Sequence, residues 1–185
     1  YIQVHRAEAD DAIGVLCYEY GKVLLDGSEE KILIMSGDKD FIQLQKFANV
    51  FQYDPIRKKM VRSNDAETYL VEHILKGDRG DGVPNCLSKD DVFVSGGRQK
   101  PMRQTTMQKI KDVINEVPYE KINGEFEWAN GFHRNRKLVD LQYTPDYLRE
   151  EILEQFSIDP GGREKLFNYF VKRKLNNLVE NISEF

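Results

Sequence analysis

Long apolar runs are missing from this sequence, and so is any grouping of cysteine and histidine that suits a bound zinc ion. A membrane-spanning helix needs roughly 18 consecutive apolar residues, and no run approaches that length. No signal peptide opens the chain, so we expect neither secretion nor a membrane partner. The two cysteines, Cys17 and Cys86, lack metal-ligand spacing, and the three histidines have no partner at zinc spacing. We therefore expect reduced thiols and no zinc site.

An initiator methionine is also absent, and Tyr1–Val4 has the character of a strand end. We expect the sequence to be a fragment that begins inside a domain.

A strong charge of either sign is lacking too, since the formal net charge is −4. Hydrophobic residues make up 40% and charged residues 31%, the mixture of a soluble globular protein. The acids are unevenly placed, because seven of them fall into three short clusters where cations could offset them. The net charge therefore does not exclude a nucleic-acid partner.

Hydrophobic spacing predicts an alternation of helices and strands in the first half of the chain. Residues 8–20 have one apolar stripe, Ile13, Leu16, Cys17 and Tyr20, at helical spacing. The further elements that we expect are strands at 31–35, 50–53 and 58–62, a turn at 26–27, a short helix at 41–47, and a helix at 66–76 that Asp65 caps. This order predicts an α/β fold with parallel pairing, in which ligands gather beyond the carboxyl ends of the strands.

The second half of the chain differs from the first in composition. Residues 77–103 are rich in glycine, proline and charge. Helices are expected at about 104–116, 145–156 and 162–180, separated by a turn-prone stretch at 119–135 and by Pro160-Gly161-Gly162. We therefore divide the chain into an α/β part, residues 1–85, and a mostly helical part, residues 86–185.

Three carboxylate clusters stand out: Glu8/Asp10/Asp11, Asp38/Asp40 and Asp78/Asp81. Glu8 and Asp11 would share one face of a helix, and an extended backbone would put Asp38 and Asp40 on one side of the chain. Hard divalent cations such as Mg²⁺ take oxygen ligands of this kind. Two such ions would activate water and stabilise the leaving oxygen in phosphodiester hydrolysis.

Each cluster also has a structural interpretation. Acids in a first helical turn are favoured by the helix dipole, acids after a strand can be a solvated turn, and Asp78/Asp81 can be a polar loop. Spacing alone leaves these alternatives open.

Three motifs together resemble the structure-specific 5′ nucleases, the family that includes flap endonucleases and the 5′-nuclease domain of bacterial DNA polymerase I. They are Glu8-Ala9-Asp10-Asp11, Asp38-Lys39-Asp40 and Gly77-Asp78-Arg79-Gly80-Asp81, in the family's order. The tail, residues 169–185, most resembles the ribonuclease H enzymes of T-even-like bacteriophages. The resemblance covers nearly the whole chain and implies the downstream part of a mainly parallel-sheet, PIN-like nuclease domain followed by a helical region.

The resemblance also implies roles for the acids. Two Mg²⁺ ions, which Mn²⁺ can replace, are expected at the clusters. Asp10 and Asp38 resemble ligands of the first ion, supported by Glu8. Asp40, Asp78 and Asp81 resemble the surroundings of the second, and Asp11 is expected to lie outside the direct ligands or to cap its helix. Asp10, Asp38, Asp40 and Asp81 are the expected catalytic residues.

The implied activity is a 5′→3′ exonuclease and flap endonuclease that removes RNA primers and adjoining DNA during lagging-strand replication. Its substrates would be DNA and RNA·DNA duplexes with 5′ ends or flaps, in the cytoplasm of an infected bacterium. Single-stranded DNA-binding protein and a sliding clamp are the partners to consider, the former at residues 178–185. Two alternatives remain: a catalytically incomplete module that binds branched DNA or a replication protein, and a small single-strand ribonuclease.

A basic stretch follows the third cluster. The family's glycine-rich duplex-binding hairpin is not matched at residues 85–91, so contacts to DNA would come from side chains elsewhere. Between residues 96 and 111 there are five cations and no acid. Arg98, Lys100, Arg103 and Lys109 are the candidates for sequence-independent phosphate contacts, and a solvated surface is the alternative.

Four aromatic residues, Tyr119, Phe126, Trp128 and Phe132, could stack on bases, but packing beneath a long loop is the preferred interpretation.

Overall fold

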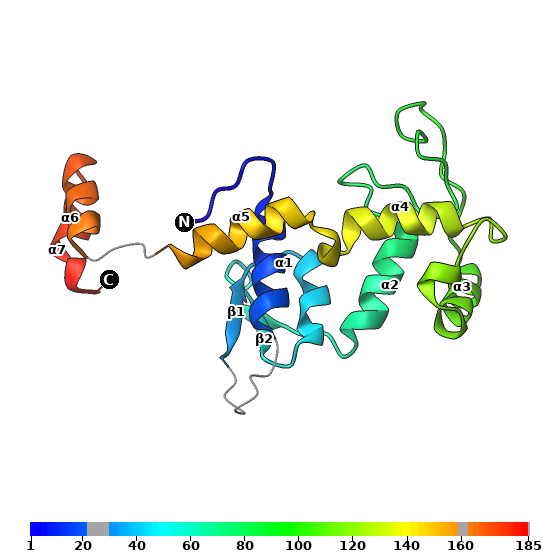
Figure 1. The fold of residues 1–185 in the computed structure, drawn as a ribbon, viewed down its shortest axis with the longest axis horizontal. Coiled ribbons are helices and arrows are strands. Elements are labelled where there is room, and N and C mark those ends of the chain that lie inside the picture. Colours follow the sequence, from blue (N-terminus) through cyan, green and yellow to red (C-terminus); the bar gives the residue numbers. More distant parts are fainter. Residues whose placement is uncertain (22–29, 159–162, 185) are drawn as a thin grey trace.

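The computed structural model describes residues 1–21, 30–158 and 163–184 (Figure 1). The turn predicted at 26–27 and the break predicted at 160–162 lie outside these residues. The helices are α1 (Ala9–Tyr20), α2 (Ala66–Lys76), α3 (Gln104–Glu116), α4 (Ala129–Val139), α5 (Asp146–Ser157), α6 (Arg163–Lys172) and α7 (Asn176–Glu180). The short 3-10 helices are η1 (Asp40–Lys46), η2 (Tyr119–Lys121), η3 (Leu141–Tyr143) and η4 (Ile182–Glu184). The strands are β1 (Ile32–Met35), β2 (Val50–Asp54) and β3 (Lys59–Val61).

The strands form one small mixed sheet in the order β1-β2-β3. β1 and β2 are parallel, with Ile32 opposite Val50, and β2 and β3 form the expected antiparallel hairpin, with Gln52 opposite Val61. The predicted α/β class and the parallel pairing of the first two strands are confirmed. The three strands do not by themselves make the mainly parallel sheet that the family resemblance implied.

Helix α1 is buried on two sides (Figure 1). Val15 packs with Leu148 and Ile152 of α5, whereas Cys17 packs with the core formed by β1, β2 and η1. The single stripe predicted from spacing is therefore wrong in part: Tyr20 is 42% exposed, and Val15 is fully buried. A stripe describes a helix with one covered face, and α1 has two.

The two faces of the sheet differ sharply. Ile34 and Val50 are buried against α1 and η1. Leu33, Met35 and Phe51 point to the other face and are 53%, 62% and 40% exposed. Alternation along a strand places them there, so one face of the sheet is apolar and uncovered within the described residues.

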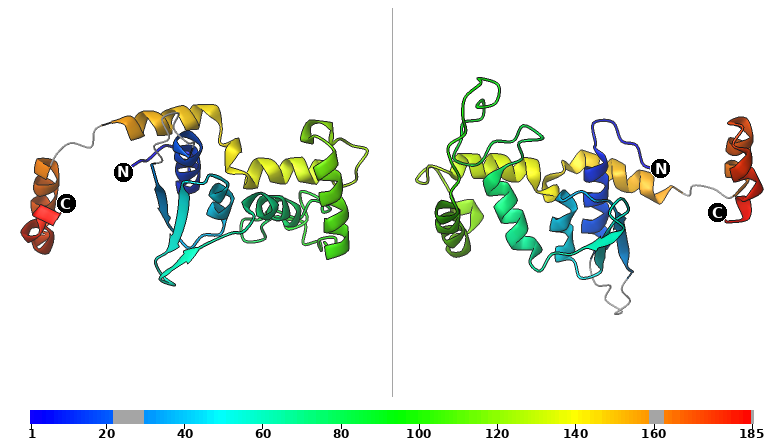
Figure 2. Two further views of the ribbon diagram at one scale, coloured as in Figure 1. Left: turned by 90° about the horizontal axis from the view of Figure 1, so that it is seen from below. Right: turned by 180° about the vertical axis from the view of Figure 1, so that it is seen from behind.

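The second core is helical and joins α2 to α3 and α4. Ile74 and Leu75 of α2 pack with Ile110 of α3 and with Phe132 of α4, and α4 continues through η3 into α5 (Figures 1 and 2). The turn-prone stretch predicted at 119–135 is wrong, since it contains η2 and most of α4. Trp128 and Phe132 are buried in this core, which supports packing over base stacking, though under a helix rather than a loop. The division of the chain at residues 85/86 stays a prediction.

The predicted helix 162–180 is two helices, α6 and α7. Lys174 has a left-handed backbone, φ 56°, which no continuous α-helix can contain. Across the parts of the chain that the structure describes, no helix combines the length and the apolar character needed to cross a bilayer.

Candidate metal-binding pocket

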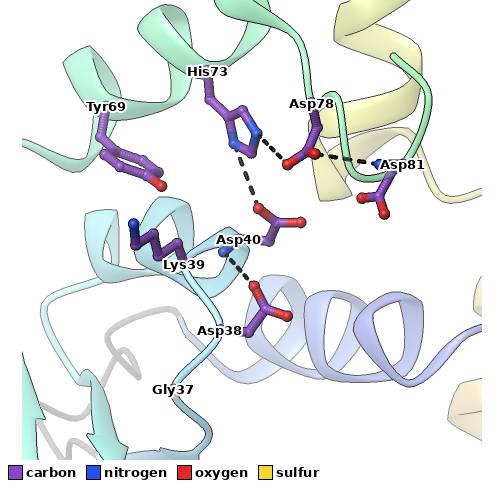
Figure 3. A pocket seen from close by; sticks show the side chains of 8 residues that line it. All are labelled: Gly37, Asp38, Lys39, Asp40, Tyr69, His73, Asp78 and Asp81. Atoms are coloured by element: carbon purple, nitrogen blue, oxygen red, sulfur yellow. Dashed lines mark hydrogen bonds and ion pairs between the residues drawn. The ribbon is translucent and has the colours of Figure 1, made fainter.

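Four of the predicted carboxylates line one pocket. Asp38 and Asp40 follow the carboxyl end of β1, and Asp78 and Asp81 lie in the turn after α2. They face one another across a cavity of about 460 Å³ that Gly37, Lys39, Tyr69 and His73 complete (Figure 3). Segments about forty positions apart in the sequence are thus brought to a single place.

A buried glutamine positions the first of these two segments. Gln52 of β2 is fully buried, and its amide donates to the carbonyl oxygens of Ser36 at 2.9 Å and Asp38 at 2.5 Å. The extended backbone expected at residues 38–40 is wrong, because Lys39 is helical with φ −77° and ψ −18°. Asp38 Oδ1 instead accepts from the Asp40 N–H at 3.1 Å, a side-chain turn that starts η1. Both acids still line the pocket.

Gly77 allows the tight turn that carries Asp78 and Asp81. Gly77 ends α2 with φ +66°, and a Cβ there would lie 2.4 Å from the carbonyl oxygen of Val83. The chain turns back at this point, and Asp78 Oδ1 accepts from the N–H groups of Gly80 at 2.7 Å and Asp81 at 3.3 Å. Burial alone would raise the pKa of Asp78, but these two N–H groups and His73 lower it below the usual value. Asp78 is therefore held as a carboxylate.

His73 joins the two segments. Its Nδ1 lies 3.5 Å from Asp40 Oδ1, and its Nε2 lies 3.4 Å from Asp78 Oδ2 (Figure 3). One donor atom from each of the three side chains falls in a group whose members all lie within 4.8 Å of one another. Sequence spacing predicts no zinc role for the histidines, and the predicted acidic site does not include this residue. Its one sequence signal is its position on the inward side of a helix that leads directly into the Asp78 turn.

The pocket concentrates negative charge. Burial, followed by the charges of Asp38 and Asp40, raises the pKa of Asp10 to about 6 from its ordinary 3.8. Burial also raises the pKa of Asp40; His73 opposes that rise, and Asp38, Asp78 and Asp81 add to it. Asp10 is thus near enough to sense the acids of the second cluster. Carboxylates that repel one another in this way suit a bound divalent cation, which would offset their charge.

None of the three acids of the first cluster lines this pocket, although Asp10 lies near enough to be affected by the charges of Asp38 and Asp40. Glu8 is exposed at the start of α1 and borders a separate hollow with Ile2 and Ile152. Asp11 accepts from the Glu8 N–H at 2.9 Å and from the Thr144 hydroxyl at 3.1 Å. Asp11 therefore caps α1 and ties it to the start of α5, and a part for either residue in metal binding stays a prediction.

The candidate DNA-binding cations lie on and before α3, and all four are exposed. Arg98, Arg103 and Lys109 make no salt bridge among the residues that the structure describes, whereas Lys100 pairs with Glu127. The loop that carries Arg98 and Lys100 is anchored by Asn85, whose N–H donates to Gln99 Oε1 at 2.7 Å and whose side chain donates to the Lys100 carbonyl at 2.8 Å. The basic side chains of Arg98, Arg103 and Lys109, on and before α3, are thus available for contacts with phosphates.

Fold and pocket together define an α/β protein with a carboxylate-rich site suited to hard divalent cations. Comparison with known proteins gives the family. The profile described as "T4 RNase H, C terminal" matches residues 64–185, about two thirds of the chain, so the chain belongs to this family.

A curated relative extends the match. The chain is 33% identical, over 192 aligned positions, to the protein named Ribonuclease H of Enterobacteria phage T4. The alignment covers 100% of this chain and 60% of the phage T4 protein. The chain thus spans about three fifths of the length of this relative, and the resemblance to the phage ribonuclease H enzymes is confirmed.

Proposed function

We propose that this chain forms part of a Mg²⁺-dependent 5′ nuclease that hydrolyses phosphodiester bonds in RNA·DNA and DNA duplexes. The observation that carries the proposal is the convergence of Asp38, Asp40, Asp78 and Asp81 in one pocket. Membership of the phage ribonuclease H family supports the same reaction class. The finer assignment is a 5′→3′ exonuclease and flap endonuclease that removes RNA primers and adjoining DNA.

The residues present fit two divalent cations. Asp38, with Asp10 beside it, would hold one ion, and Asp40, Asp78 and Asp81 would surround the other. The raised pKa values of Asp10 and Asp40 support this, because burial and then the charges of neighbouring carboxylates raise them, and a bound cation would offset both effects. When bound, Mg²⁺ supplies a hydroxide nucleophile and stabilises the leaving oxygen.

The chain's own residues orient the substrate around this pocket. Lys39 lines it on the side of Tyr69 (Figure 3) and would offer its ammonium group to a backbone phosphate. Arg98, Arg103 and Lys109 would bind the duplex through its phosphates, with Lys100 contributing when its pair with Glu127 opens. Such contacts fix the position of the duplex without reading its sequence.

Two further features belong to the same proposal. The apolar side chains of Leu33, Met35 and Phe51, on the other face from Ile34 and Val50, make β1 and β2 apolar on both faces, which supports the proposed mainly parallel architecture with both faces covered. The relation to a phage protein supports a role in phage DNA replication inside the infected bacterium, where a single-stranded DNA-binding protein and a sliding clamp are candidate partners.

The test is cleavage of a 5′-labelled RNA·DNA duplex in Mg²⁺ and in EDTA. Because the relative is longer than this chain, the assay includes the 185-residue chain and a version extended upstream of Tyr1. Asp38→Asn and Asp81→Asn are expected to abolish Mg²⁺-dependent cleavage in the active form while leaving duplex binding in place. Asp146→Asn, an exposed acid at the start of α5, is the matched control.

The outcomes separate the nuclease from the binding module. Cleavage by the extended version alone means that this chain supplies only part of the active site. Cleavage by neither version, with duplex binding retained, favours a module that binds branched DNA without cutting it. Wild-type rates in Asp38→Asn and Asp81→Asn would overturn the metal assignment.

A further inference from the structure

His73 occupies a position that a purely carboxylate metal site does not explain. It lies on α2 in the middle of the acidic pocket, and its side chain is only 13% exposed. Nδ1 is a buried polar atom that has no hydrogen-bond partner among the described residues. A buried polar atom without a hydrogen-bond partner is unfavourable, so its retention at this place points to a ligand.

The partners of the ring suit a histidine that binds a cation through Nδ1. Asp78 Oδ1 is occupied by the backbone N–H groups of Gly80 and Asp81, which leaves Oδ2 to face His73 Nε2 at 3.4 Å. A carboxylate that accepts two backbone N–H groups is held in its ionised form, and an ionised carboxylate oxygen can only accept. An imidazole that binds a cation through Nδ1 carries its proton on Nε2, and Nε2 here faces an oxygen that accepts it.

Nδ1 itself faces an oxygen atom of the other acidic segment. Asp40 Oδ1 lies 3.5 Å from Nδ1, and the contact has no hydrogen-bond geometry. Two ligand atoms that are each about 2.1 Å from one cation lie about 3.0–3.4 Å apart, depending on the angle between them. The spacing of Nδ1 and Oδ1 is close to this range. The Asp78–His73 contact has the form of the carboxylate that orients a metal-binding histidine in many proteins.

We propose that His73 Nδ1 and Asp40 form a nitrogen–oxygen subsite for a divalent transition-metal cation, with Asp78 orienting the imidazole rather than binding that cation directly. The inference rests on the proposed function, because it specifies the chemistry of one of the two cation positions. It also changes the expected metal. Mg²⁺ prefers oxygen ligands, whereas imidazole suits the divalent transition metals, so the subsite favours Mn²⁺ over Mg²⁺.

Pulsed electron paramagnetic resonance of the Mn²⁺-loaded chain tests the ligand directly. A directly bound imidazole nitrogen modulates the electron spin echo of Mn²⁺, and a histidine that only positions Asp40 does not. We expect a nitrogen modulation in the wild-type chain that changes its frequencies when all histidines carry ¹⁵N. The isotope measurement needs no substitution, so it is independent of any effect on folding.

Substitutions then assign the signal to one of the three histidines. His73→Gln is expected to abolish the modulation and to bind Mn²⁺ at least tenfold more weakly, with a change below threefold for Mg²⁺. His133→Gln and His5→Gln are the matched controls and are expected to keep the modulation. His133 Nε2 is already paired with the Ile122 carbonyl at 2.7 Å, and His5 is exposed at the amino end. Circular dichroism checks that each variant is folded.

The possible results separate this inference from the proposed function. Mn²⁺ bound without nitrogen modulation, or modulation that survives in folded His73→Gln, overturns the subsite and leaves the carboxylate site standing. Failure of the chain to bind either Mn²⁺ or Mg²⁺ contradicts both.

Discussion

Asp10 responds to its burial and to the nearest acids of the pocket, because burial and then the charges of Asp38 and Asp40 raise its pKa to about 6. The folded protein therefore binds a proton at Asp10 between about pH 4 and pH 6, where the unfolded chain does not. The stability associated with this proton is fully present below the ordinary value of 3.8 and disappears as the pH rises through 6. Above pH 6, a bound cation would remove part of the repulsion.

Replacing Asp10 with asparagine should therefore raise the melting temperature of the metal-free protein at pH 7.5 and change it less at pH 5. Mg²⁺ should stabilise the wild-type chain more at pH 7.5 than at pH 5, and should stabilise Asp10→Asn less than wild type. Thermal unfolding at both pH values, with and without Mg²⁺, measures this. Asp146→Asn is the control, and a lower melting temperature of metal-free Asp10→Asn at pH 7.5 would contradict the expected repulsion.

Residue types alone identify the acids of the pocket but not the groups that position them. Asp38, Asp40, Asp78 and Asp81 are predictable from short motifs, since each pair is close in sequence. Gln52 and His73 act across the fold, and a single glutamine or histidine carries no local pattern. Their partners are decided by how β2 and α2 pack, which spacing does not determine.

At the scale of elements, the turn that follows α2 determines where Asp78 and Asp81 lie. Gly77 and Gly82 both have positive φ, but they differ in their surroundings. A Cβ at Gly77 would meet backbone atoms of Val83 and Pro84 at 2.4–2.7 Å, whereas a Cβ at Gly82 would meet nothing within 4 Å. Comparing substitutions at the two glycines therefore separates the cost of a left-handed backbone from the cost of a steric conflict.

We expect Gly82→Ala to cost about 1–2 kcal/mol, the strain of a left-handed backbone alone. Gly77→Ala should cost about 3 kcal/mol or more, because the chain must also move away from the new Cβ, and it should weaken cation binding by displacing Asp78. Urea unfolding and Mg²⁺ titration give the two quantities. Equal destabilisation of the two variants would show that the close approach at Gly77 is unimportant.

Most elements are predictable from spacing and capping, including β1, β2, the β3 return arm, α2, α3 and α5. Helix α4 is not, and Gly131 shows the reason. Asn130-Gly131 has the composition of a turn, yet Gly131 lies inside α4, where a Cβ would be 2.1 Å from the carbonyl oxygen of Cys86. Glycine is needed there for a close contact between α4 and the loop after Pro84, and that contact depends on the tertiary fold.

At the scale of the whole molecule, the acidic pocket and the basic residues on and before α3 have opposite proposed tasks, one to bind metal cations and the other to bind phosphates. α2 connects them: it carries His73, and its Glu72 pairs with Lys111 of α3 at 3.0 Å. The net charge of −4 therefore conceals two surfaces of opposite sign.

Replacing the three basic residues that make no salt bridge among the described residues, Arg98, Arg103 and Lys109, tests whether this surface binds the duplex. Arg98→Gln, Arg103→Gln and Lys109→Gln together should weaken duplex binding and reduce the slope of log affinity against log salt by about 0.9 for each phosphate interaction that is removed. The matched control replaces Lys59, Arg62 and Lys137, which are also exposed, with glutamine. Fluorescence anisotropy across a salt series measures the slope; an equal reduction in both triple variants would mean that binding is not specific to this surface.

The central claim is that Asp38, Asp40, Asp78 and Asp81 form one centre that binds the two proposed cations. Calorimetric titration of the chain with Mg²⁺ tests this claim most directly. If the claim holds, Asp38→Asn and Asp81→Asn each lower the affinity at least tenfold, although the two residues lie on different segments, and Asp146→Asn leaves it unchanged. Affinities for Mg²⁺ in Asp38→Asn and Asp81→Asn equal to that of the wild-type chain would contradict the claim.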